Sequence, residues 1–525
     1  MKRIICIVLV LILSLSLFAC NKGNRDGDSQ TDDVSKTLNP SASVKIKIVA
    51  ANFGYGVDYL NAVARAYENQ NKHVSITVTT TVLPHQVLSQ IEGGLDTYDM
   101  FFGTVQLATS YNRGFMIALD DVYNSIPEGE TKTVAQKMGV AASGYTFNGH
   151  YTGLPYINSP VGLLVNYTTL DELFGTGNYT LPQTTDELFT FCKAIRSAGA
   201  YSFCISTSDS YMQYAVETWW NQYDSESYNN YFAGKVVVDG QLVDAQQGES
   251  LTAPGKLEAL KICEILCKKS NGYVHQYANS MNFAEAQAAY CGLGYGFVDQ
   301  KLSVFSPNGA WFENEVGSIL TDNPQDIKMI RFPVISSIIN VVPDGSIADD
   351  AELSALISAI DAGSTSLSGT GYTVSQADFD YIKRARSIVD NNTAAMQCGI
   401  TACSQNQEEC KKFLTFYASD VAAKIIATKL SGLTTPFGYN PASDSTIVMS
   451  NFVRSVYNTI DGSIGVQPVL NSLLFLNGLQ CIGSLSGYTS AFFNSTNTAA
   501  RIYQDDITTY TREWPYLTAP INEGQ

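Results

Sequence analysis

The sequence predicts an α/β fold, in which helices join the strands of an open sheet. Val44–Ala51 favours a strand because β-branched residues are frequent in it, and Met100–Phe102 is a continuous apolar run of the kind found in central strands. Between them, apolar residues from Leu60 to Tyr67 recur three and four positions apart, the spacing of a helix packed on a sheet. Strand, helix and strand in this order are typical of an α/β protein.

Two loops at strand ends predict a binding rim. The first strand runs into Asn52–Gly56, whose two glycines permit positive φ and close approach by a ligand. Val74–Val82 alternates apolar and polar residues, which favours a strand at a sheet edge. The central strand ends at Gly103–Gln106. Since parallel strands joined by helices place their carboxyl-end loops on one rim, we expect both loops to lie where a ligand binds.

Helices are expected in the middle and late parts of the chain. Thr184 or Thr185 is the predicted N-cap of a helix over Asp186–Ala198. Pro254–Lys269 has the spacing of an amphipathic helix. Ser404–Gln407 has the spacing of a capping box at the start of another helix.

Size and composition restrict the class of protein. With 525 residues the chain exceeds one ordinary domain, so we expect two lobes. Hydrophobic residues make up 45% and charged residues 15%, which permits a sizeable core and excludes global disorder. The formal net charge of −17 argues against nucleic acid or an anionic membrane surface as a partner. The four histidines are scattered and no C-x-x-C pair exists, so we expect no metal and no cofactor.

The amino terminus has the features of a secretion signal. Lys2 and Arg3 precede the apolar run Ile4–Phe18, whose length suits a signal peptide better than a membrane span. The run ends at Leu17-Phe18-Ala19-Cys20, which resembles the lipobox of bacterial lipoproteins. That resemblance implies a leader over residues 1–20 and acylation of the Cys20 thiol, whose acyl chains would anchor the protein stably. An ordinary cleaved signal peptide is the alternative interpretation.

Residues 21–43 follow the leader and are rich in Asp, Ser, Asn and Gly without periodicity, so we expect a flexible tether. Of the eleven cysteines, removal of Cys6 and Cys20 leaves nine. We expect most of these nine to be small buried hydrophobic residues. A disulfide between Cys192 and Cys204, or between Cys398 and Cys403, remains open.

In order and spacing, the landmarks resemble the extracellular solute-binding proteins of ABC importers, in the family of the maltose- and oligosaccharide-binding proteins. The similar segments, in chain order, are Ala64–Glu68, Tyr98–Gly103, Tyr151–Pro155, Asn166-Tyr167, Leu181–Thr185, Gly309–Trp311 and Ser404–Tyr417. The resemblance implies a two-lobed fold of the periplasmic-binding-protein type (type II), with the ligand held in the cleft between the lobes.

The same resemblance implies an organisation of the chain. Residues 44–125 and about 387–435 would form lobe one, and residues 126–335 and about 436–525 would form lobe two. Residues 336–386 are an insertion without a predicted place. The implied partners are a small-molecule carbohydrate and the ABC permease subunits in the membrane. We expect a monomer that binds no nucleic acid and meets the membrane only through its lipid anchor.

A sugar site needs flat aromatic surfaces for C–H faces and directional groups for hydroxyls. Trp311 matches the family's stacking tryptophan, and Tyr156 matches an aromatic residue beside the cleft. The other candidates for contact with the solute are Phe53, Tyr55 and Thr104 on the rim, Asn158, Glu313 and Glu315 as hydroxyl partners, and Trp219 or Trp220 from a stretch dense in aromatics. For each aromatic the alternative is a place in the core, and for each glutamate a place on the surface.

The predicted function is therefore capture of a carbohydrate, an oligosaccharide by the resemblance, for import without chemistry on the ligand. Two alternatives from other classes stand beside it. A secreted glycoside hydrolase would need two carboxylates flanking the scissile bond, for which Asp99, Glu313 and Glu315 are candidates. A surface lipoprotein could also capture glycans without any transporter.

Overall fold

The chain is described by a computed structural model over residues 35–52, 54–208, 211–365, 373–466, 472–479, 487–494 and 496–521. The predicted leader, the lipidation candidate Cys20 and the rim residue Phe53 lie outside these ranges. All elements below belong to the unit Val34–Gln525.

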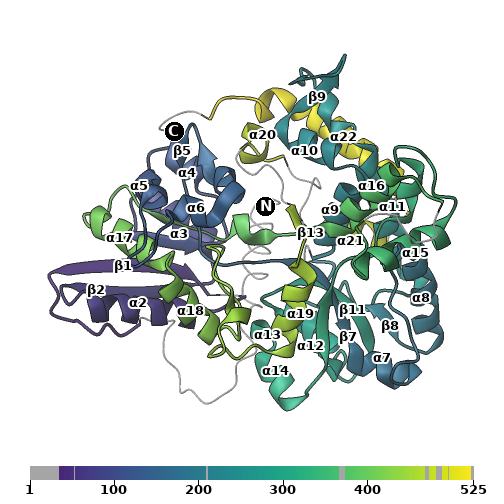
Figure 1. Cartoon of the computed structure of the whole chain (residues 1–525), viewed down its shortest axis with the longest axis horizontal. Helices are drawn as coiled ribbons and strands as arrows, with labels where there is room; N and C mark the ends of the chain where they lie inside the picture. Colours follow the sequence, from purple (N-terminus) through teal and green to yellow (C-terminus); the bar gives the residue numbers. More distant parts are fainter. Residues whose placement is uncertain are drawn as a thin grey trace, which may run out of the picture. The chain divides into compact units, whose positions relative to one another are not determined.

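The first sheet contains the three strands predicted at the start of the chain (Figure 1). Its order is β2-β1-β3-β14-β6, with bounds Val44–Ala51 for β1, Val74–Thr81 for β2, Met100–Gly103 for β3, Leu154–Pro155 for β6 and Gln397–Ile400 for β14. β1 is parallel to β2 and to β3, while β14 is antiparallel to β3 and to β6. The predicted edge strand, helix and central strand are all confirmed.

Helices and short elements around this sheet form the first lobe. In chain order these are α2 (Asp58–Gln70), α3 (Pro84–Glu92), α4 (Ala108–Asn112), α5 (Asp120–Asn124), α6 (Val134–Met138), η1 (Gly139–Tyr145), β4 (Thr146–Phe147), β5 (His150–Tyr151), α17 (Gln407–Tyr417) and α18 (Asp420–Lys429). The predicted apolar stripe of α2 is buried, including Leu60, Val63 and Ala64.

The second sheet has four strands in the order β12-β7-β11-β8. Their bounds are Val161–Asn166 for β7, Tyr201–Phe203 for β8, Ser303–Gly309 for β11 and Ile327–Ile330 for β12. β7 is antiparallel to both neighbours, and β11 is parallel to β8. Every residue of β7 and of β11 is buried, as expected of central strands.

The second lobe surrounds this sheet. Its further elements are α7 (Tyr167–Phe174), α8 (Thr185–Ser197), α9 (Tyr211–Tyr223), α10 (Ser225–Ala233), β9 (Lys235–Val238), β10 (Gln241–Asp244), η2 (Glu249–Leu251), α11 (Pro254–Cys267), η3 (Lys269–Asn271), α12 (Phe283–Ala288), η4 (Ala289–Leu293), α13 (Phe312–Glu315), α14 (Gly317–Asp322), η5 (Ser336–Asn340), α15 (Asp350–Asp361), α16 (Gln376–Ser387), α19 (Asn451–Ile460), α20 (Leu473–Leu476), α21 (Gly487–Phe493) and α22 (Ala499–Leu517). The hydroxyl of Thr184 caps α8, as predicted, by accepting from Glu187 N at 3.2 Å.

Segments that cross between the lobes bond to one another. The chain passes from β6 to β7 and returns through β13 (Ile388–Asp390) and η6 (Asn392–Ala395) to β14, and β13 pairs with β15 (Ile464–Val466). The backbone N–H of Asn158 donates to the carbonyl of Thr434 at 2.9 Å, and that of Asn392 to the carbonyl of Ser159 at 2.9 Å. A further crossing runs from α18 through η7 (Pro441–Ser443) to α19, which packs on β12.

The segment without a predicted place packs into the second hydrophobic cluster. Helices α15 and α16 and the turn η5 contribute buried residues to the same hydrophobic cluster as α8, α9 and α11. Leu353, Leu356 and Phe379 of this segment have no exposed surface. β6, which comes after residue 125, lies in the first sheet.

The end of the predicted tether is bonded to the first lobe. Ser35 exchanges two hydrogen bonds with Val78, at 3.1 and 2.9 Å. The carboxylate of Glu68, a fully buried residue, accepts from the Thr37 hydroxyl at 2.5 Å and from the Leu38 N–H at 2.9 Å. The prediction of a tether that reaches residue 43 is therefore wrong for its last part, since a buried acceptor holds it.

Neither candidate disulfide forms, since no described cysteine is joined to another by a disulfide. Cys204 instead donates its S–H to the Ala286 carbonyl at 3.2 Å, and Cys398 is buried in β14 whereas Cys403 is exposed. Seven of the eight described cysteines are buried, which confirms the expectation of small hydrophobic residues.

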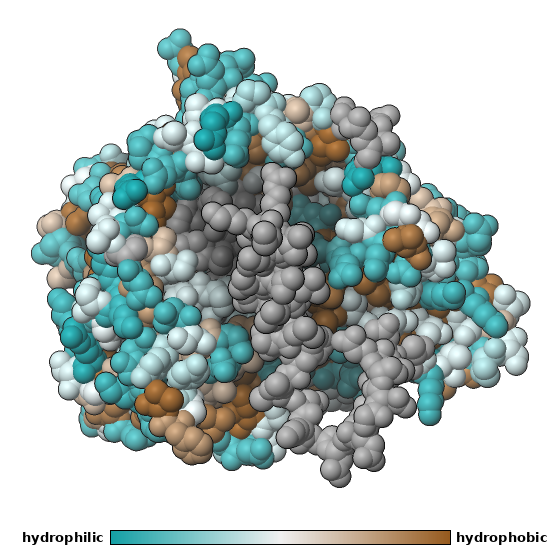
Figure 2. Space-filling model, turned by 180° about the vertical axis from the view of Figure 1, so that it is seen from behind, coloured by the Kyte–Doolittle hydropathy of each residue, from teal (hydrophilic) through white to brown (hydrophobic). Residues whose placement is uncertain are grey.

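Hydrophobic side chains on the face shown in Figure 2 occur in small groups between hydrophilic ones.

Within the described ranges, no helix combines the length and apolar character needed to cross a bilayer. Over those same residues, no three histidine, cysteine or acidic side chains are grouped as a metal site would require.

Candidate functional site

One cavity collects side chains from both lobes at the ends of their strands. Its volume is about 220 Å³. It is lined by Ala51, Gly54, Tyr55, Gly56, Tyr59, Thr104, Tyr156, Tyr211, Tyr214, Trp311, Glu315, Asn392 and Met396. We call it the aromatic cavity, because six of these residues are tyrosine or tryptophan.

Its position follows from the sheet topology. Ala51 is the last residue of β1, and Thr104 and Tyr156 directly follow β3 and β6. Trp311 comes two residues after β11, the central strand of the other sheet. The carboxyl ends of these strands therefore meet at the cavity, as predicted for the loops after β1 and β3.

Trp311 lies at the centre of the aromatic side chains. Its ring centroid lies 6.3 Å from that of Tyr55, 6.3 Å from that of Tyr211 and 6.1 Å from that of Tyr214. The ring planes of Tyr55 and Trp311 are nearly perpendicular, at 85°, an edge-to-face arrangement. The indole N–H donates to the Tyr211 hydroxyl at 3.4 Å, and Trp311 is only 5% exposed.

The loop after β1 is fastened to α13 of the second lobe. Gly54 adopts a φ of +61°, and the Asn314 amide donates to its carbonyl at 2.5 Å. The Glu315 carboxylate accepts hydrogen bonds from the Gln287 amide, at 2.7 Å, and from the Gly54 backbone. Burial raises the pKa of Glu315 above its usual range, and these two hydrogen bonds oppose that shift.

The phenols around the cavity stay neutral. Burial raises the pKa of Tyr55 and of Tyr156. The hydroxyl of Tyr55 donates to the Asn158 carbonyl at 3.0 Å and lies 2.9 Å from the Ser159 hydroxyl, so its ring is attached to a crossing segment. Tyr156 donates to the Met396 sulfur at 3.7 Å.

The cavity gathers five of the residues expected to contact the solute: Tyr55, Thr104, Tyr156, Trp311 and Glu315. Its remaining polar and aromatic lining was not predicted and consists of Tyr59, Tyr211, Tyr214 and Asn392. Tyr211 and Tyr214 stand three positions apart at the start of α9, in the aromatic-rich stretch that also contains the predicted candidates Trp219 and Trp220. Their spacing on one helix face was the available signal.

The structure places both Trp219 and Trp220 in the core of the second lobe. They are 1% and 0% exposed, and the Trp219 indole N–H donates to the Pro333 carbonyl at 3.1 Å. Trp220 lies edge-to-face against Tyr228 and Tyr231. Their position agrees with the alternative of a core role, and neither lines the aromatic cavity.

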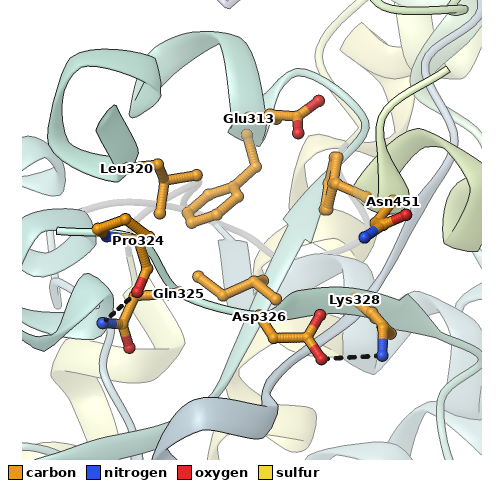
Figure 3. Close-up of a pocket in the computed structure, with 10 residues that line it drawn as sticks. Glu313, Leu320, Pro324, Gln325, Asp326, Lys328 and Asn451 are labelled. Carbon is orange, nitrogen blue, oxygen red and sulfur yellow. Dashed lines mark hydrogen bonds and ion pairs between the residues drawn. The ribbon is translucent and has the colours of Figure 1, made fainter. Parts of the chain in front are cut away.

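Two other candidates line different cavities. Glu313 borders a cavity of about 490 Å³ between α13, α14, β12 and α19, where Lys328 and Asp326 form an ion pair at 2.9 Å (Figure 3). Its carboxylate accepts from the Ser450 hydroxyl at 2.6 Å. Asn158 borders a cavity of about 1010 Å³, and its amide donates to the Thr435 carbonyl at 3.0 Å. Phe53 lies outside the described residues.

Comparison with known proteins agrees with the predicted family. Residues 62–302 match the family model of the bacterial extracellular solute-binding proteins. No curated protein is similar enough in sequence to count as a match.

Solved structures of similar fold cover most of the chain. A protein from a study of xylan utilisation by Caldanaerobius polysaccharolyticus aligns with a TM-score of 0.59 and 12% identity, over 89% of this chain and 100% of its own. RafE in complex with raffinose aligns with a TM-score of 0.56 and 12% identity, over 91% and 100%. The GacH receptor of Streptomyces glaucescens, known unliganded and with acarbose, aligns with a TM-score of 0.57 and 12% identity, over 90% and 98%.

At this identity the likeness establishes the fold, which is the two-lobed α/β fold of solute-binding proteins. The match over residues 62–302 and the shared fold make the chain similar to the extracellular solute-binding proteins, which are binding proteins and not enzymes.

Proposed function

We propose that the protein captures a carbohydrate in the aromatic cavity, as the substrate-binding component of an ABC importer. We further propose that a lipid on Cys20 anchors it at the extracytoplasmic face of the cell membrane. Closure of the lobes around the solute would then present a surface that the permease subunits recognise.

The composition of the aromatic cavity is the main support for a sugar. Sugar rings have C–H-rich faces that fit against flat aromatic side chains, and hydroxyl edges that need directional partners. Trp311 and five tyrosines supply the first kind of group, and Thr104, Asn392 and Glu315 supply the second. The lining comes from both lobes, so a solute there would contact both at once.

Similar structures support the same class of solute. RafE is known with raffinose, GacH with acarbose, and a third neighbour is described as a chitin oligosaccharide binding protein. The volume of about 220 Å³ is below the roughly 300–1,000 Å³ typical of pockets for drug-sized ligands. In this conformation the cavity would enclose only part of an oligosaccharide, and the rest would extend out of it.

The first test is calorimetry of the protein against a panel of sugars, with tryptophan emission as a second readout. Trp311→Ala should weaken binding of any sugar that is found by about tenfold or more, because about 1.4 kcal/mol of lost ring contact corresponds to a factor of ten. Trp219→Phe is the matched control, since Trp219 lies in the core and should leave affinity unchanged. Equal affinity of Trp311→Ala and the unaltered protein would reject the site.

The anchor is tested in cells. Since one acyl chain holds a protein only marginally and two hold it stably, Cys20→Ala should move the protein from the membrane fraction to the soluble extracellular fraction. The mass of the mature amino-terminal peptide, measured by mass spectrometry, should show the acyl groups on Cys20. A membrane fraction unaffected by Cys20→Ala would contradict the anchor and leave the binding site untouched.

A further inference from the structure

We propose that the solute bound in the aromatic cavity carries a positive charge, as a protonated amino sugar or another ammonium compound does. The inference rests on the proposed function and specifies the class of solute. It follows from which charged groups the cavity contains.

Six aromatic side chains and one carboxylate line the cavity, and none of its described lining residues is basic. The aromatic set is Tyr55, Tyr59, Tyr156, Tyr211, Tyr214 and Trp311. The undescribed residues nearest to this lining in the sequence, at positions 53, 209 and 210, are Phe, Asp and Ser and add no positive charge. A solute with a negative charge would therefore meet no opposite charge here.

Aromatic rings attract cations because the face of each ring carries partial negative charge. The attraction increases when the cation is removed from water, as it would be between rings that are almost fully buried. Tyr55, Tyr59, Tyr156 and Trp311 are each at most 5% exposed. Several such rings with one carboxylate form an arrangement that suits an ammonium group, which interacts favourably with the rings and with the negative charge.

Glu315 lacks a cationic partner within the described residues. Its hydrogen bonds come from the Gln287 amide and the Gly54 N–H, both neutral groups, and no Lys, Arg or His forms an ion pair with it there. A half-buried carboxylate without an opposite charge is costly, because burial removes water from it. The ammonium group of a solute would supply the missing charge.

Glu313 provides a comparison on the same short helix. It stands two residues before Glu315, it is also shielded from water, and its carboxylate accepts from the Ser450 hydroxyl at 2.6 Å. It lines the other cavity, beside α14 and α19 (Figure 3). A change of charge at Glu313 therefore controls for the loss of one negative charge near, but not in, the aromatic cavity.

The test is calorimetry of the full-length protein against matched sugars of one to three rings that differ only at C2. Each sugar is offered with an amine, an acetamide or a hydroxyl group there, and choline serves as an ammonium compound that is not a sugar. We expect the amine forms to bind at least tenfold more tightly than the matched hydroxyl and acetamide forms. We also expect Glu315→Gln to reduce that preference at least tenfold, and Glu313→Gln to preserve it.

The outcomes separate the two proposals. If hydroxyl or acetamide sugars bind as tightly as the amines, or if Glu315→Gln weakens all forms equally, a charged solute is rejected and carbohydrate capture stands. If choline binds and no sugar does, carbohydrate capture is rejected and the preference for a cation stands. If none of these compounds binds, both proposals fail. Thermal melting of each variant verifies that it is folded.

Discussion

At the scale of single residues, the absence of a side chain at position 309 decides where Trp311 can lie. A Cβ on Gly309 would lie 2.1 Å from Cζ3 of the Trp311 indole and 2.2 Å from Cη2, far inside van der Waals contact. The φ of Gly309 is not in the left-handed region, so the requirement is for space and not for backbone freedom. Glycine at the end of β11 is therefore part of the site, although it does not line the cavity.

We expect Gly309→Ala to weaken solute binding nearly as much as Trp311→Ala, because the added methyl group must displace the indole. Overpacking of a buried site should also lower the free energy of unfolding by about 1–3 kcal/mol. Calorimetric binding and thermal melting measure the two effects. Gly317→Ala is the control, since a Cβ there meets nothing within 4 Å. Unchanged affinity of Gly309→Ala would show that the position of the indole is not important for binding.

Sequence reasoning identified site residues where they stand in loops after strands. Tyr55 and Thr104 follow β1 and β3, strands that the apolar patterns predict, and a rim was the expected consequence. Tyr156 was expected beside the cleft from the family resemblance. Sequence reasoning failed on α9, where Tyr211 faces the cavity while Trp219 faces the core. Tyr211 and Trp219 are both aromatic, and composition does not show which face of a helix points to a cavity. That depends on how α9 packs on its neighbours, which involves residues far away in the sequence.

At the scale of elements, Ser404 near the start of α17 binds a residue far away in the sequence and does not cap the helix. The spacing Ser404–Gln407 predicted a capping box for α17, but Asn406 is the N-cap and no side chain caps the helix. The Ser404 hydroxyl instead donates to the Asp99 carboxylate at 2.5 Å, whose other oxygen accepts from the Lys47 N–H at 2.8 Å. The prediction of a capping box is therefore wrong, and Asp99 instead joins Ser404 to the first strand, β1.

The packing partners of two other segments could not be predicted from the sequence either. These are the end of the predicted tether and residues 336–386. Both are rich in small polar residues, and sequence offers no pattern that says what they pack against. The structure supplies the partners: the buried Glu68 carboxylate for Thr37 and Leu38, and the second hydrophobic cluster for α15 and α16. Helices and strands with a clear apolar period could be predicted, while segments held by single buried acceptors could not.

At the scale of the whole molecule, the two sheets, the crossing segments and the cavity form one arrangement. Each crossing segment bonds to another, and their residues Tyr156, Asn392 and Met396 line the aromatic cavity while Asn158 and Thr393 line the larger cavity. A rotation about these segments would therefore change both cavities at once. The lobes also touch away from the crossing segments, where the Asn314 amide donates to the Gly54 carbonyl at 2.5 Å.

The Asn314–Gly54 bond gives a test of closure that does not alter the cavity lining. A solute that contacts both lobes binds only the closed conformation, so its apparent affinity is reduced by the fraction of molecules that are closed. One neutral hydrogen bond contributes about 0.5–1.5 kcal/mol. If the closed fraction in the free protein is small, Asn314→Ala should weaken solute binding by roughly twofold to twelvefold, because about 1.4 kcal/mol corresponds to a factor of ten in affinity.

Asn323→Ala is the matched control for this change. The Asn323 amide donates to the Cys291 carbonyl at 2.7 Å, a bond of the same type that stays within the second lobe. Its loss should lower the melting temperature and leave affinity unchanged, whereas Asn314→Ala should also enlarge the radius of gyration of the solute-free protein in X-ray scattering. If both variants bind with the affinity of the unaltered protein, closure does not depend on the contact between the loop after β1 and α13, and the crossing segments alone must determine it.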